Sequence, residues 1–328
     1  MKIILEHLPL KEPHILHSDF PHKKIPCVAT IGVFDGIHRG HQHILKEVVT
    51  QARGRGIASL MVTFDVPPQR LLKKEFAGTI MNFDQKKTCL TRTGIDYVWF
   101  LRTTDRLLGL SAQNFLIHLL RHFSIKLLCV GEGFRFGRGS HADSVTLDRL
   151  ARRYGFALEV IKKRTMRGRV VSSSLIRRAI EAGNFSTARR FLGRDYIVAG
   201  RVVRGRGIGR TLGFPTANII CEDYVIPKTG VYAAVVRANG RLYRAAVNIG
   251  THPTVVPLSR RIVEAHCLDF HGSLTGHTIE ILFIKRMRDE RKFPSRARLV
   301  QAINKDVEKI KRNYSFRGKK VFSSCLKI

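Results

Sequence analysis

Acidic residues are scarce in this 328-residue sequence, in which 25 Asp and Glu stand against 58 Lys and Arg, for a formal net charge of +33. Such an excess is typical of proteins that bind nucleic acid or anionic membranes. The basic residues are spread along the chain, however, and no RRM-like aromatic signature or zinc-finger spacing accompanies them. We therefore favour a solvated basic surface around sites for polyanionic nucleotides, and expect no specific nucleic-acid partner. No motif excludes weak RNA binding.

Long apolar runs and paired cysteines are also missing. No apolar run approaches the roughly 20 residues that span a bilayer. The opening MKIILEHLPLKEPHI is too interrupted by charge and proline for a secretory signal. None of the six cysteines forms a C-x-x-C pair, so we expect free, buried thiols and neither a disulfide framework nor a zinc site. These features predict a cytoplasmic protein with no membrane partner, long enough for two domains.

Apolar runs and helical patterns alternate in the first half of the chain. We expect strands at residues 27–34, 58–64, 96–101, 127–130 and 157–161, and helices at 40–52, 84–92, 111–120 and 145–154. This alternation predicts a parallel, doubly wound sheet. Ligands of such sheets gather at the carboxyl ends of the strands, here residues 34–41, 64–68 and 131–139.

The stretch VATIGVFDGIHRGHQH, residues 28–43, joins the first of these strands to the first helix. A glycine-rich turn before a helix N-terminus can cradle phosphate with backbone N–H groups. Two histidines three residues apart can both donate to one phosphate, or stabilise one that gains charge in a transition state. The alternative is a surface loop with solvated histidines. The candidates are Gly32, Phe34, Asp35, Gly36, His38, Gly40 and His41.

The second half has a different pattern, which follows a short linking helix at residues 184–192. Short β-runs at 197–203, 230–236, 242–249, 263–268 and 279–283 are separated by turn residues, without helices between them. The pair Asn239-Gly240 is a hairpin signal. This pattern predicts an antiparallel sheet or a small closed barrel, followed by a terminal helix at 295–311.

Two stretches carry anion-binding chemistry beside the histidine motif. Ser172, Ser173 and Ser174 precede Arg177 at a helix start, which makes an anion clamp or merely an N-cap. The stretch GRGIGRTLGFPTAN, residues 205–218, holds Gly205, Gly207 and Gly209, which allow close approach to phosphates, with Arg206 and Arg210 alongside. On its own this loop could equally be a glycine-rich hairpin turn. Thr216 and Asn218 supply hard oxygen atoms suited to Mg²⁺.

Read together, these motifs resemble those of one family. The string GVFDGIHRGH resembles the H-x-G-H signature of nucleotidyltransferases, and SSSLIR resembles the S-S-T-x-I-R motif that holds ATP phosphates there. The string GFPTAN resembles the P-T-A-N motif of riboflavin kinases, and NIGTHPT, VEAH and residues 287–293 resemble that family's later motifs and its flap. From about residue 25 to 310 the chain resembles the prokaryotic bifunctional riboflavin kinases/FMN adenylyltransferases, or FAD synthetases.

This resemblance implies a fold and two activities. We expect a Rossmann-like nucleotidyltransferase domain at residues 1–184, a small antiparallel β-barrel riboflavin kinase domain with a terminal helix at 185–314, and a basic tail at 315–328. The second domain would phosphorylate riboflavin with ATP to give FMN. The first would adenylylate FMN to FAD and release pyrophosphate. The expected ligands are riboflavin, FMN, FAD, ATP and Mg²⁺. The sequence is compatible with either a monomer or a homo-oligomer.

The resemblance also assigns roles to residues. Glu264 is the expected catalytic base of the kinase, and His38 and His41 stabilise the transition state of adenylyl transfer. Thr216 and Asn218 are the expected metal ligands. The remaining members of the nucleotide site are the glycines and serines named above, with Phe34, Asp35, Arg177 and Arg210. The expected flavin-binding residues are Phe134, Phe136, Phe214, Pro215 and Arg288.

Two positions depart from the family pattern. Members usually carry T-F-x-P-H-P after the second strand, where this chain reads TFDVPP with Pro67 in place of histidine. They usually carry Asp or Asn where Gly133 stands. We therefore expect slow adenylyl transfer. The nearest alternative is a riboflavin kinase with a degenerate first domain, and a remote one is a basic RNA-binding protein on an enzyme scaffold.

Overall fold

The structure, a computed structural model, describes residues 1–5, 23–72, 76–205, 207–250 and 261–313. The predicted tail, Arg206, Cys325 and residues 251–254 lie outside this range. The described chain folds as two compact units. The first takes in residues 1–76 and 83–172, and the second takes in 77–82 together with the chain from 173 onward. The predicted boundary at 184 therefore falls between two helices of the second unit, and which activity these helices serve stays a prediction.

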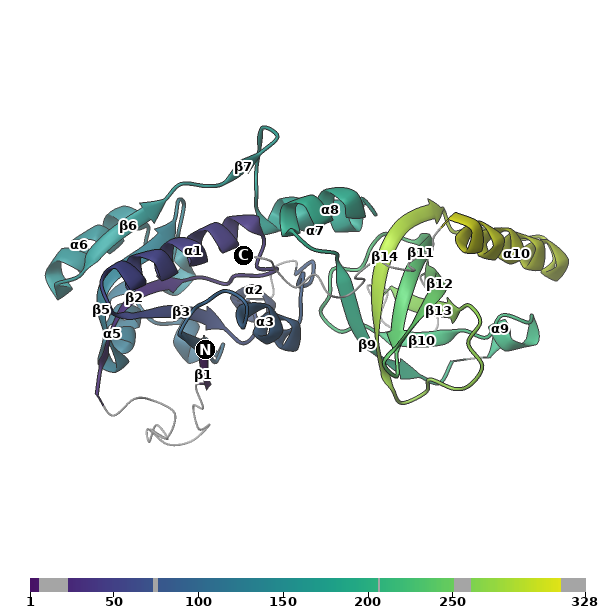
Figure 1. Ribbon diagram of the computed structural model, residues 1–328, viewed down its shortest axis with the longest axis horizontal. Coiled ribbons are helices and arrows are strands. Elements are labelled where there is room, and N and C mark those ends of the chain that lie inside the picture. Colours follow the sequence, from purple (N-terminus) through teal and green to yellow (C-terminus); the bar gives the residue numbers. More distant parts are fainter. Residues whose placement is uncertain (6–22, 73–75, 206, 251–260, 314–328) are drawn as a thin grey trace. The chain divides into compact units, whose positions relative to one another are not determined.

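The first unit is built on a parallel sheet of six strands in the order β1-β4-β3-β2-β5-β6 (Figure 1). The strands are β1 (Lys2–Leu5), β2 (Ile25–Ile31), β3 (Ala58–Phe64), β4 (Tyr97–Leu101), β5 (Phe123–Gly131) and β6 (Ala157–Ile161). Every ladder in this sheet is parallel. The predicted doubly wound sheet is thus confirmed, with β1 as an additional edge strand.

Helices cover both faces of this sheet. They are α1 (Arg39–Gly54), α2 (Pro68–Leu71), α3 (Phe83–Leu90), α4 (Asp105–Leu108), α5 (Ala112–His122) and α6 (Ser144–Tyr154). Helix α1 contacts β2, β3 and β5, whereas α5 and α6 share a core with alternate residues of the same strands, among them Cys27, Ala29 and Ile31. Because successive side chains of a strand point to opposite faces, the two groups of helices lie on opposite sides of the sheet. Ser111 caps α5 as predicted, by accepting a hydrogen bond from Asn114 N.

The second unit is a closed antiparallel barrel in the order β10-β13-β12-β11-β14-β9 (Figure 1). Its strands are β9 (Ile197–Val203), β10 (Ala217–Ile220), β11 (Gly230–Ala238), β12 (Arg241–Gly250), β13 (Ile262–Cys267) and β14 (Thr278–Arg288). The helices are α7 (Ser173–Glu181), α8 (Phe185–Leu192), α9 (Ile208–Thr211) and α10 (Arg296–Asn313). Of the two predicted architectures, an antiparallel sheet or a small closed barrel, the structure shows the barrel. The turn between β11 and β12 has positive φ at both Asn239 and Gly240, as the dipeptide predicts.

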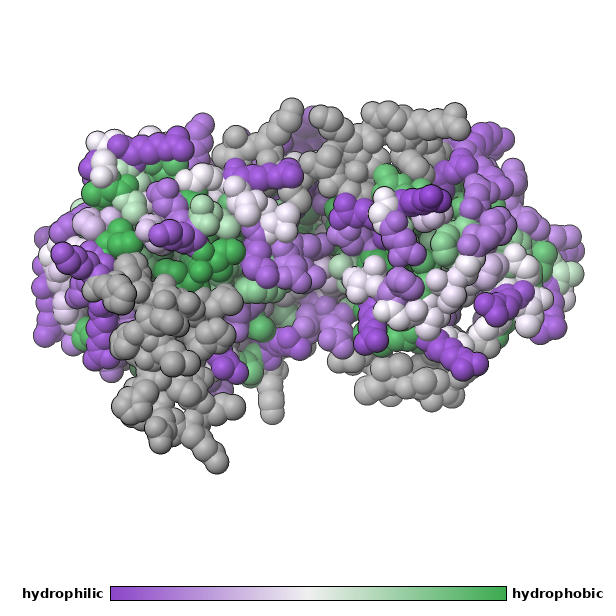
Figure 2. All heavy atoms as spheres, turned by 60° about the horizontal axis from the view of Figure 1, so that its bottom comes forward, coloured by the Kyte–Doolittle hydropathy of each residue, from purple (hydrophilic) through white to green (hydrophobic). Residues whose placement is uncertain are grey.

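Hydrophilic residues are spread over the visible surface (Figure 2), and the described cysteines are free, as expected. On the face shown in Figure 2, hydrophilic residues are spread over both units and are not gathered in one place. Cys27, Cys89, Cys129, Cys221 and Cys267 are free, and all but Cys221 are buried. A small hairpin, β7 (Thr165–Met166) with β8 (Arg169–Val170), precedes α7. No helix of the described residues is long and apolar enough to cross a membrane.

Candidate active sites

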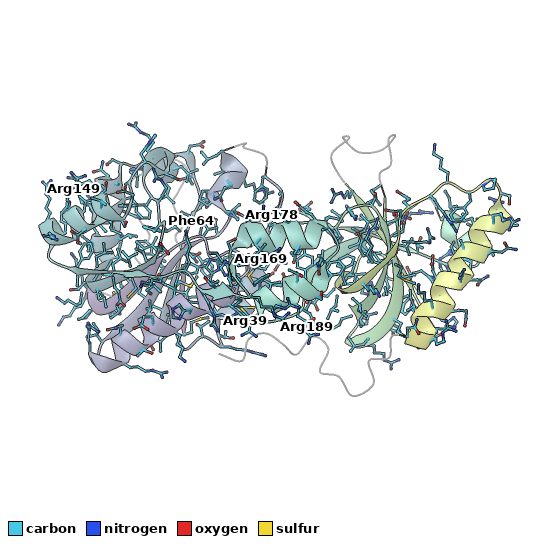
Figure 3. All side chains as sticks on the ribbon, turned by 90° about the horizontal axis from the view of Figure 1, so that it is seen from above. Arg39, Phe64, Arg149, Arg169, Arg178 and Arg189 are labelled. Carbon is cyan, nitrogen blue, oxygen red and sulfur yellow. The ribbon has the colours of Figure 1, made fainter. Side chains whose placement is uncertain are left out.

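The histidine motif lies at the switch point of the parallel sheet. Strand β2 pairs with β3 on one side and with β5 on the other. From β2 the chain first adds β3 and β4, and only later crosses to β5 on the opposite side. In open α/β sheets, ligands bind outside the carboxyl ends of the strands at such a point. Figure 3 labels Arg39, the first residue of α1, and Phe64, the last residue of β3.

The loop between β2 and α1 has an unusual backbone. Phe34 and Ile37 have φ of 50° and 36°, and Gly36 has φ of 82°. A left-handed φ is uncommon for residues other than glycine, and for a β-branched isoleucine it is strained. Phe34, Asp35 and Ile37 are nevertheless buried. Strain of this kind persists only where the surroundings hold it in place, and it gathers at active sites.

The two histidines stand together at the N-terminus of α1. Their rings stack with centroids 3.6 Å apart, and the His41 ring meets Phe34 edge-on at 5.0 Å. His38 is the N-cap, and its Nδ1 accepts a hydrogen bond from His41 N at 3.3 Å. An accepting Nδ1 carries no proton, so the N–H of the neutral His38 ring is at Nε2. The first turn of α1 holds no acidic residue to neutralise the positive end of the helix dipole.

Two glycines of the motif lie where a side chain would be tightly packed. A Cβ at position 40 would lie 3.1 Å from His38 Cε1 and 3.4 Å from the carbonyl oxygen of Val171. A Cβ at position 32 would lie 3.0 Å from the Phe34 ring. The predicted residues Gly32, Phe34, Asp35, Gly36 and His38 thus lie in the loop after β2, and Gly40 and His41 lie in the first turn of α1.

The two departures from the family pattern lie in the neighbouring loops. Pro67 is the N-cap of α2, three residues after β3 ends. Gly133 follows β5 with φ of +79°, and a Cβ there would lie 3.3 Å from the Lys163 ammonium nitrogen. Aspartate and asparagine tolerate this left-handed region better than most side chains. The backbone of the Gly133 loop is therefore compatible with the residue that the family pattern has there.

The phenylalanines of this loop are largely internal. The rings of Phe134 and Phe136 stack with centroids 5.5 Å apart. Phe136 is buried in the core beneath α5 and α6, and Phe134 packs partly buried against it. Their predicted role in flavin binding stays a prediction.

The serine–arginine motif begins helix α7, which starts at Ser173 directly after Ser172. Ser174 lies in its first turn. Arg177 Nε donates to the carbonyl oxygen of Gly78 at 3.0 Å, so at least one edge of its guanidinium serves a structural contact within the second unit. Its role as an ATP ligand stays a prediction.

In the barrel, Glu264 occupies the centre of a polar row. It pairs in register with Asn218 of β10 on one side and with Asn248 of β12 on the other. Directly opposite residues on neighbouring strands point to the same face. Their chain neighbours Ile219, Val263 and Ile249 are buried, so the row Asn218, Glu264 and Asn248 lies on the outer face of the barrel. The predicted base and one predicted metal ligand are thereby adjacent.

The glycine-rich loop folds tightly over the same row. A Cβ at Gly205 would lie 2.0 Å from Asn218 Nδ2, and a Cβ at Gly209 would lie 2.4 Å from the carbonyl oxygen of Phe214 and 3.1 Å from Thr216 Oγ1. Gly207, with φ of +74°, is the N-cap of the short helix α9, and Arg210 lies within that helix. Glycine is therefore required here because the loop backbone approaches Thr216 and Asn218.

Phe214 and Pro215 lie beside His266, two residues after Glu264. His266 Nδ1 forms a hydrogen bond with the Pro215 carbonyl oxygen at 2.9 Å, and its ring meets Phe214 edge-on at 5.5 Å. Phe214 also packs with Met287 against a small cluster that α10 closes with Val307 and Ile310. These contacts of Phe214 and Pro215 hold the turn that carries Thr216 in place.

Arg288 is held by the terminal helix. Its guanidinium contacts the carboxylate of Asp306 at 2.8 Å and 2.9 Å, and both side chains are mostly buried. Val231 of β11 pairs in register with Asn248 on one side and with Arg288 on the other. Because Asn248 also pairs with Glu264, the row continues from Glu264 to Arg288. The sequence interpretation named Arg288 but not Asp306, since a pair formed between a strand and a distant helix leaves no local pattern. Asn248 and His266 stood in recognised motifs without being singled out as site residues.

Comparison with known proteins covers both units. Residues 20–175 match a family model described as FAD synthetase, and residues 192–314 match one described as riboflavin kinase. The bifunctional riboflavin kinase/FMN adenylyltransferase of Escherichia coli (strain K12) is 37% identical over 283 residues, which cover 85% of this chain and 90% of the relative. The relative of the same name from Bacillus subtilis (strain 168) is 30% identical over 317 residues, which cover 93% of this chain and 99% of the relative.

A solved structure supports the same arrangement of elements. The crystal structure of a protein from Streptococcus pneumoniae, described as a macrolide-efflux protein, superposes with a TM-score of 0.77 at 26% identity. The superposition covers 96% of this chain and all of the other.

Proposed function

The chain belongs to the family of bifunctional riboflavin kinases/FMN adenylyltransferases, and on that premise we propose how its residues divide the work. The barrel phosphorylates riboflavin to FMN, and the parallel-sheet unit adenylylates FMN to FAD. The observation that carries the kinase assignment is the pairing of Glu264 with Asn218 on one face of the barrel. For adenylyl transfer it is the histidine pair at the start of α1, at the switch point of the sheet.

In the kinase reaction, Glu264 acts as the general base. Its carboxylate takes the proton from the 5′-hydroxyl of riboflavin while that oxygen attacks the γ-phosphorus of ATP and ADP leaves. The backbone around Gly205, Gly207 and Gly209 is assigned to the ATP phosphates, because glycine leaves its N–H groups open to close approach, and Arg210 adds a positive charge to this loop. We assign the flavin to the side of Phe214, Pro215 and Arg288.

Thr216 and Asn218 fit the requirements of a magnesium site. Both supply hard oxygen atoms, and the loop that crosses them leaves no room for a side chain at Gly205 or Gly209. An ion held by these two residues would supply positive charge against the negative charge of the ATP phosphates. Thr216 and Asn218 would hold the ion, and the close approach of the glycine loop to both side chains would keep them in place.

In adenylyl transfer, a phosphate oxygen of FMN attacks the α-phosphorus of ATP, and the bond to pyrophosphate breaks. His38 Nε2 and His41 donate hydrogen bonds to the oxygens that gain charge, together with the positive end of α1. Ser172, Ser173, Ser174 and Arg177 bind ATP phosphates, and Phe134 and Phe136 serve the flavin. We expect this step to be slow, because Pro67 and Gly133 offer no side-chain hydrogen bond.

Incubation of the purified protein with riboflavin, ATP and Mg²⁺ tests both assignments. We expect FMN to form first and FAD to follow more slowly when the flavins are separated over time. FMN without FAD after long incubation with excess enzyme would contradict the adenylyltransferase assignment. Loss of FMN formation on addition of a chelator, restored by excess Mg²⁺, is expected from the oxygen ligands at Thr216 and Asn218.

A further inference from the structure

A lysine is buried beneath the histidine loop. Lys86 lies in α3, and its side chain is withdrawn from solvent. Its ammonium donates three hydrogen bonds, to the carbonyl oxygen of Val33 at 2.8 Å, to Thr63 Oγ1 at 2.8 Å and to the carbonyl oxygen of Phe64 at 3.2 Å. A lysine is rarely buried this far unless its charge is compensated. All three of its donors are used, so the site is built for an ammonium group.

The three acceptors lie at the ends of two neighbouring strands. Thr63 and Phe64 end β3, and Val33 opens the loop that follows β2. Thr63 Oγ1 itself donates to the Val33 carbonyl oxygen at 3.1 Å, so this carbonyl accepts from both side chains. The next residue, Phe34, begins the strained backbone with positive φ that leads to His38.

We propose that Lys86 is a positioning residue for adenylyl transfer, which holds the loop at residues 33–38 in the conformation that places His38 and His41. A strained loop relaxes unless its surroundings over-determine it. Lys86 supplies such a restraint, because its ammonium group donates hydrogen bonds both to the Val33 carbonyl oxygen, at the start of the loop, and to the end of β3. This inference rests on the proposed role of the histidine pair, and extends it to a residue outside the histidine motif.

The charge of Lys86 adds a pH dependence to this restraint. Burial lowers the pKa of the Lys86 ammonium to about 7, while Asp35 and Asp65 act in the opposite direction. The ammonium nitrogen also lies 5.7 Å from the centroid of the Phe100 ring. A neutral amine has two N–H donors for three acceptors. Above neutral pH one of the restraints on the two strand ends is therefore lost.

Activity and stability should respond to this titration in opposite directions. The unfolded chain holds the lysine proton up to a pH of roughly 10.4, whereas the folded chain releases it near 7. Between these values the unfolded state binds more protons, so the stability of the first unit rises with pH. Over the same range the rate of adenylyl transfer should fall, because neutral Lys86 can donate only two of its three hydrogen bonds.

The test compares Lys86→Met and Lys86→Arg with the wild type between pH 6 and 9, with FMN and ATP as substrates and FAD as product. We expect Lys86→Met to lower kcat at least tenfold at pH 6.5, with little change in the KM for ATP. Its kcat should also fall less steeply above pH 7 than that of the wild type, because the titration of Lys86 no longer contributes. Lys86→Arg, whose charge persists, should keep activity at higher pH. Lys87→Met on the same helix is the matched control, because Lys87 is partly exposed and pairs with Asp84.

Phosphorylation of riboflavin by the same preparations reports whether the barrel unit of each variant is folded, and it should be unchanged. Thermal unfolding followed by circular dichroism reports whether the parallel-sheet unit, which holds Lys86, is folded. If Lys86→Met keeps the wild-type kcat and the wild-type pH profile, the positioning role is refuted while the histidine assignment stands. If neither the wild type nor any variant forms FAD at any pH, the proposed adenylyltransferase site itself is refuted. Should Lys86→Met fail to fold, a wild-type profile in Lys86→Arg refutes the pH dependence.

Discussion

Gly205 is the position where one added methyl group most directly tests the kinase site. A Cβ at this position would lie 2.0 Å from Asn218 Nδ2 and 2.7 Å from its Cγ. Carbon contacts below 3.0 Å do not occur in folded proteins, and ordinary contact begins near 3.4 Å. The loop and the Asn218 side chain must therefore separate by about 1.4 Å in Gly205→Ala, the difference between 3.4 and 2.0 Å.

This displacement falls on the loop and the amide, because the backbone of Asn218 is fixed by its pairing with Glu264 and Val203. A misplacement of about 1 Å can cost a factor of roughly 10² in rate. We therefore expect kcat/KM for riboflavin phosphorylation to fall about 10²-fold, or about 2.7 kcal/mol in transition-state stabilisation. The concentration of Mg²⁺ needed for half-maximal rate should rise, since Asn218 is a proposed ligand.

The assay follows FMN formation with varied riboflavin and with varied Mg²⁺. Conversion of FMN to FAD by the same preparation should be unchanged, because it takes place in the other unit. Gly54→Ala is the control, since a Cβ there meets no atom within 4 Å. A Gly205→Ala enzyme that phosphorylates riboflavin within threefold of the wild-type rate, at the wild-type Mg²⁺ requirement, would refute the placement of Asn218 in the site.

The remaining predictions concern the two departures in the adenylyltransferase. Gly133→Asp should raise FAD formation from FMN, because the backbone there already has the left-handed φ that Asp tolerates and its carboxylate would lie near the Lys163 ammonium. Pro67→His should raise it further by restoring a side-chain donor, and the two together should approach the 10²–10³-fold that one transition-state contact supplies. A steady-state FAD assay decides both, and a double variant no faster than the wild type contradicts them.

The sequence predicted most of the regular elements because their patterns are local. Strand β3 is a continuous apolar run, α5 starts at a serine cap with apolar residues on one face, and Asn239-Gly240 marks the turn between β11 and β12. For α8, Asn184 is the N-cap and Gly193 ends the helix with positive φ. Each of these signals lies within a few residues of the element that it specifies.

Elements without a local signal were missed. Strand β1 has four residues and pairs only with β4 at the edge of the sheet. Strand β10 has four residues, follows Pro215 closely and contains Asn218, and proline and asparagine are depleted in strands. Its strand character therefore depends on pairing with β9 and β13. Residues 77–82 join the second unit through hydrogen bonds between Thr79 and Asp223, 144 residues apart in sequence.

The candidate sites show the same division between local and distant information. The histidine loop and the glycine-rich loop are contiguous motifs, so their residues could be named from the sequence. Lys86 could not, because in sequence it is one of two adjacent lysines on a short helix, and only the folded chain shows that one is buried under Val33 while the other is partly exposed. Asp306 likewise reveals its role only by its contact with Arg288.

The central claim is that two separate sites on this chain carry out two successive reactions, and a reciprocal pair of variants tests it most directly. Glu264→Gln removes the proposed base, and His41→Ala removes a proposed donor. Each is assayed for FMN formation from riboflavin and for FAD formation from FMN, with Glu280→Gln on β14 as the matched carboxylate control. We predict that Glu264→Gln loses at least a hundredfold in the first reaction only, and that His41→Ala loses at least a hundredfold in the second only. Wild-type FMN formation by Glu264→Gln, or wild-type FAD formation by His41→Ala, would contradict the account.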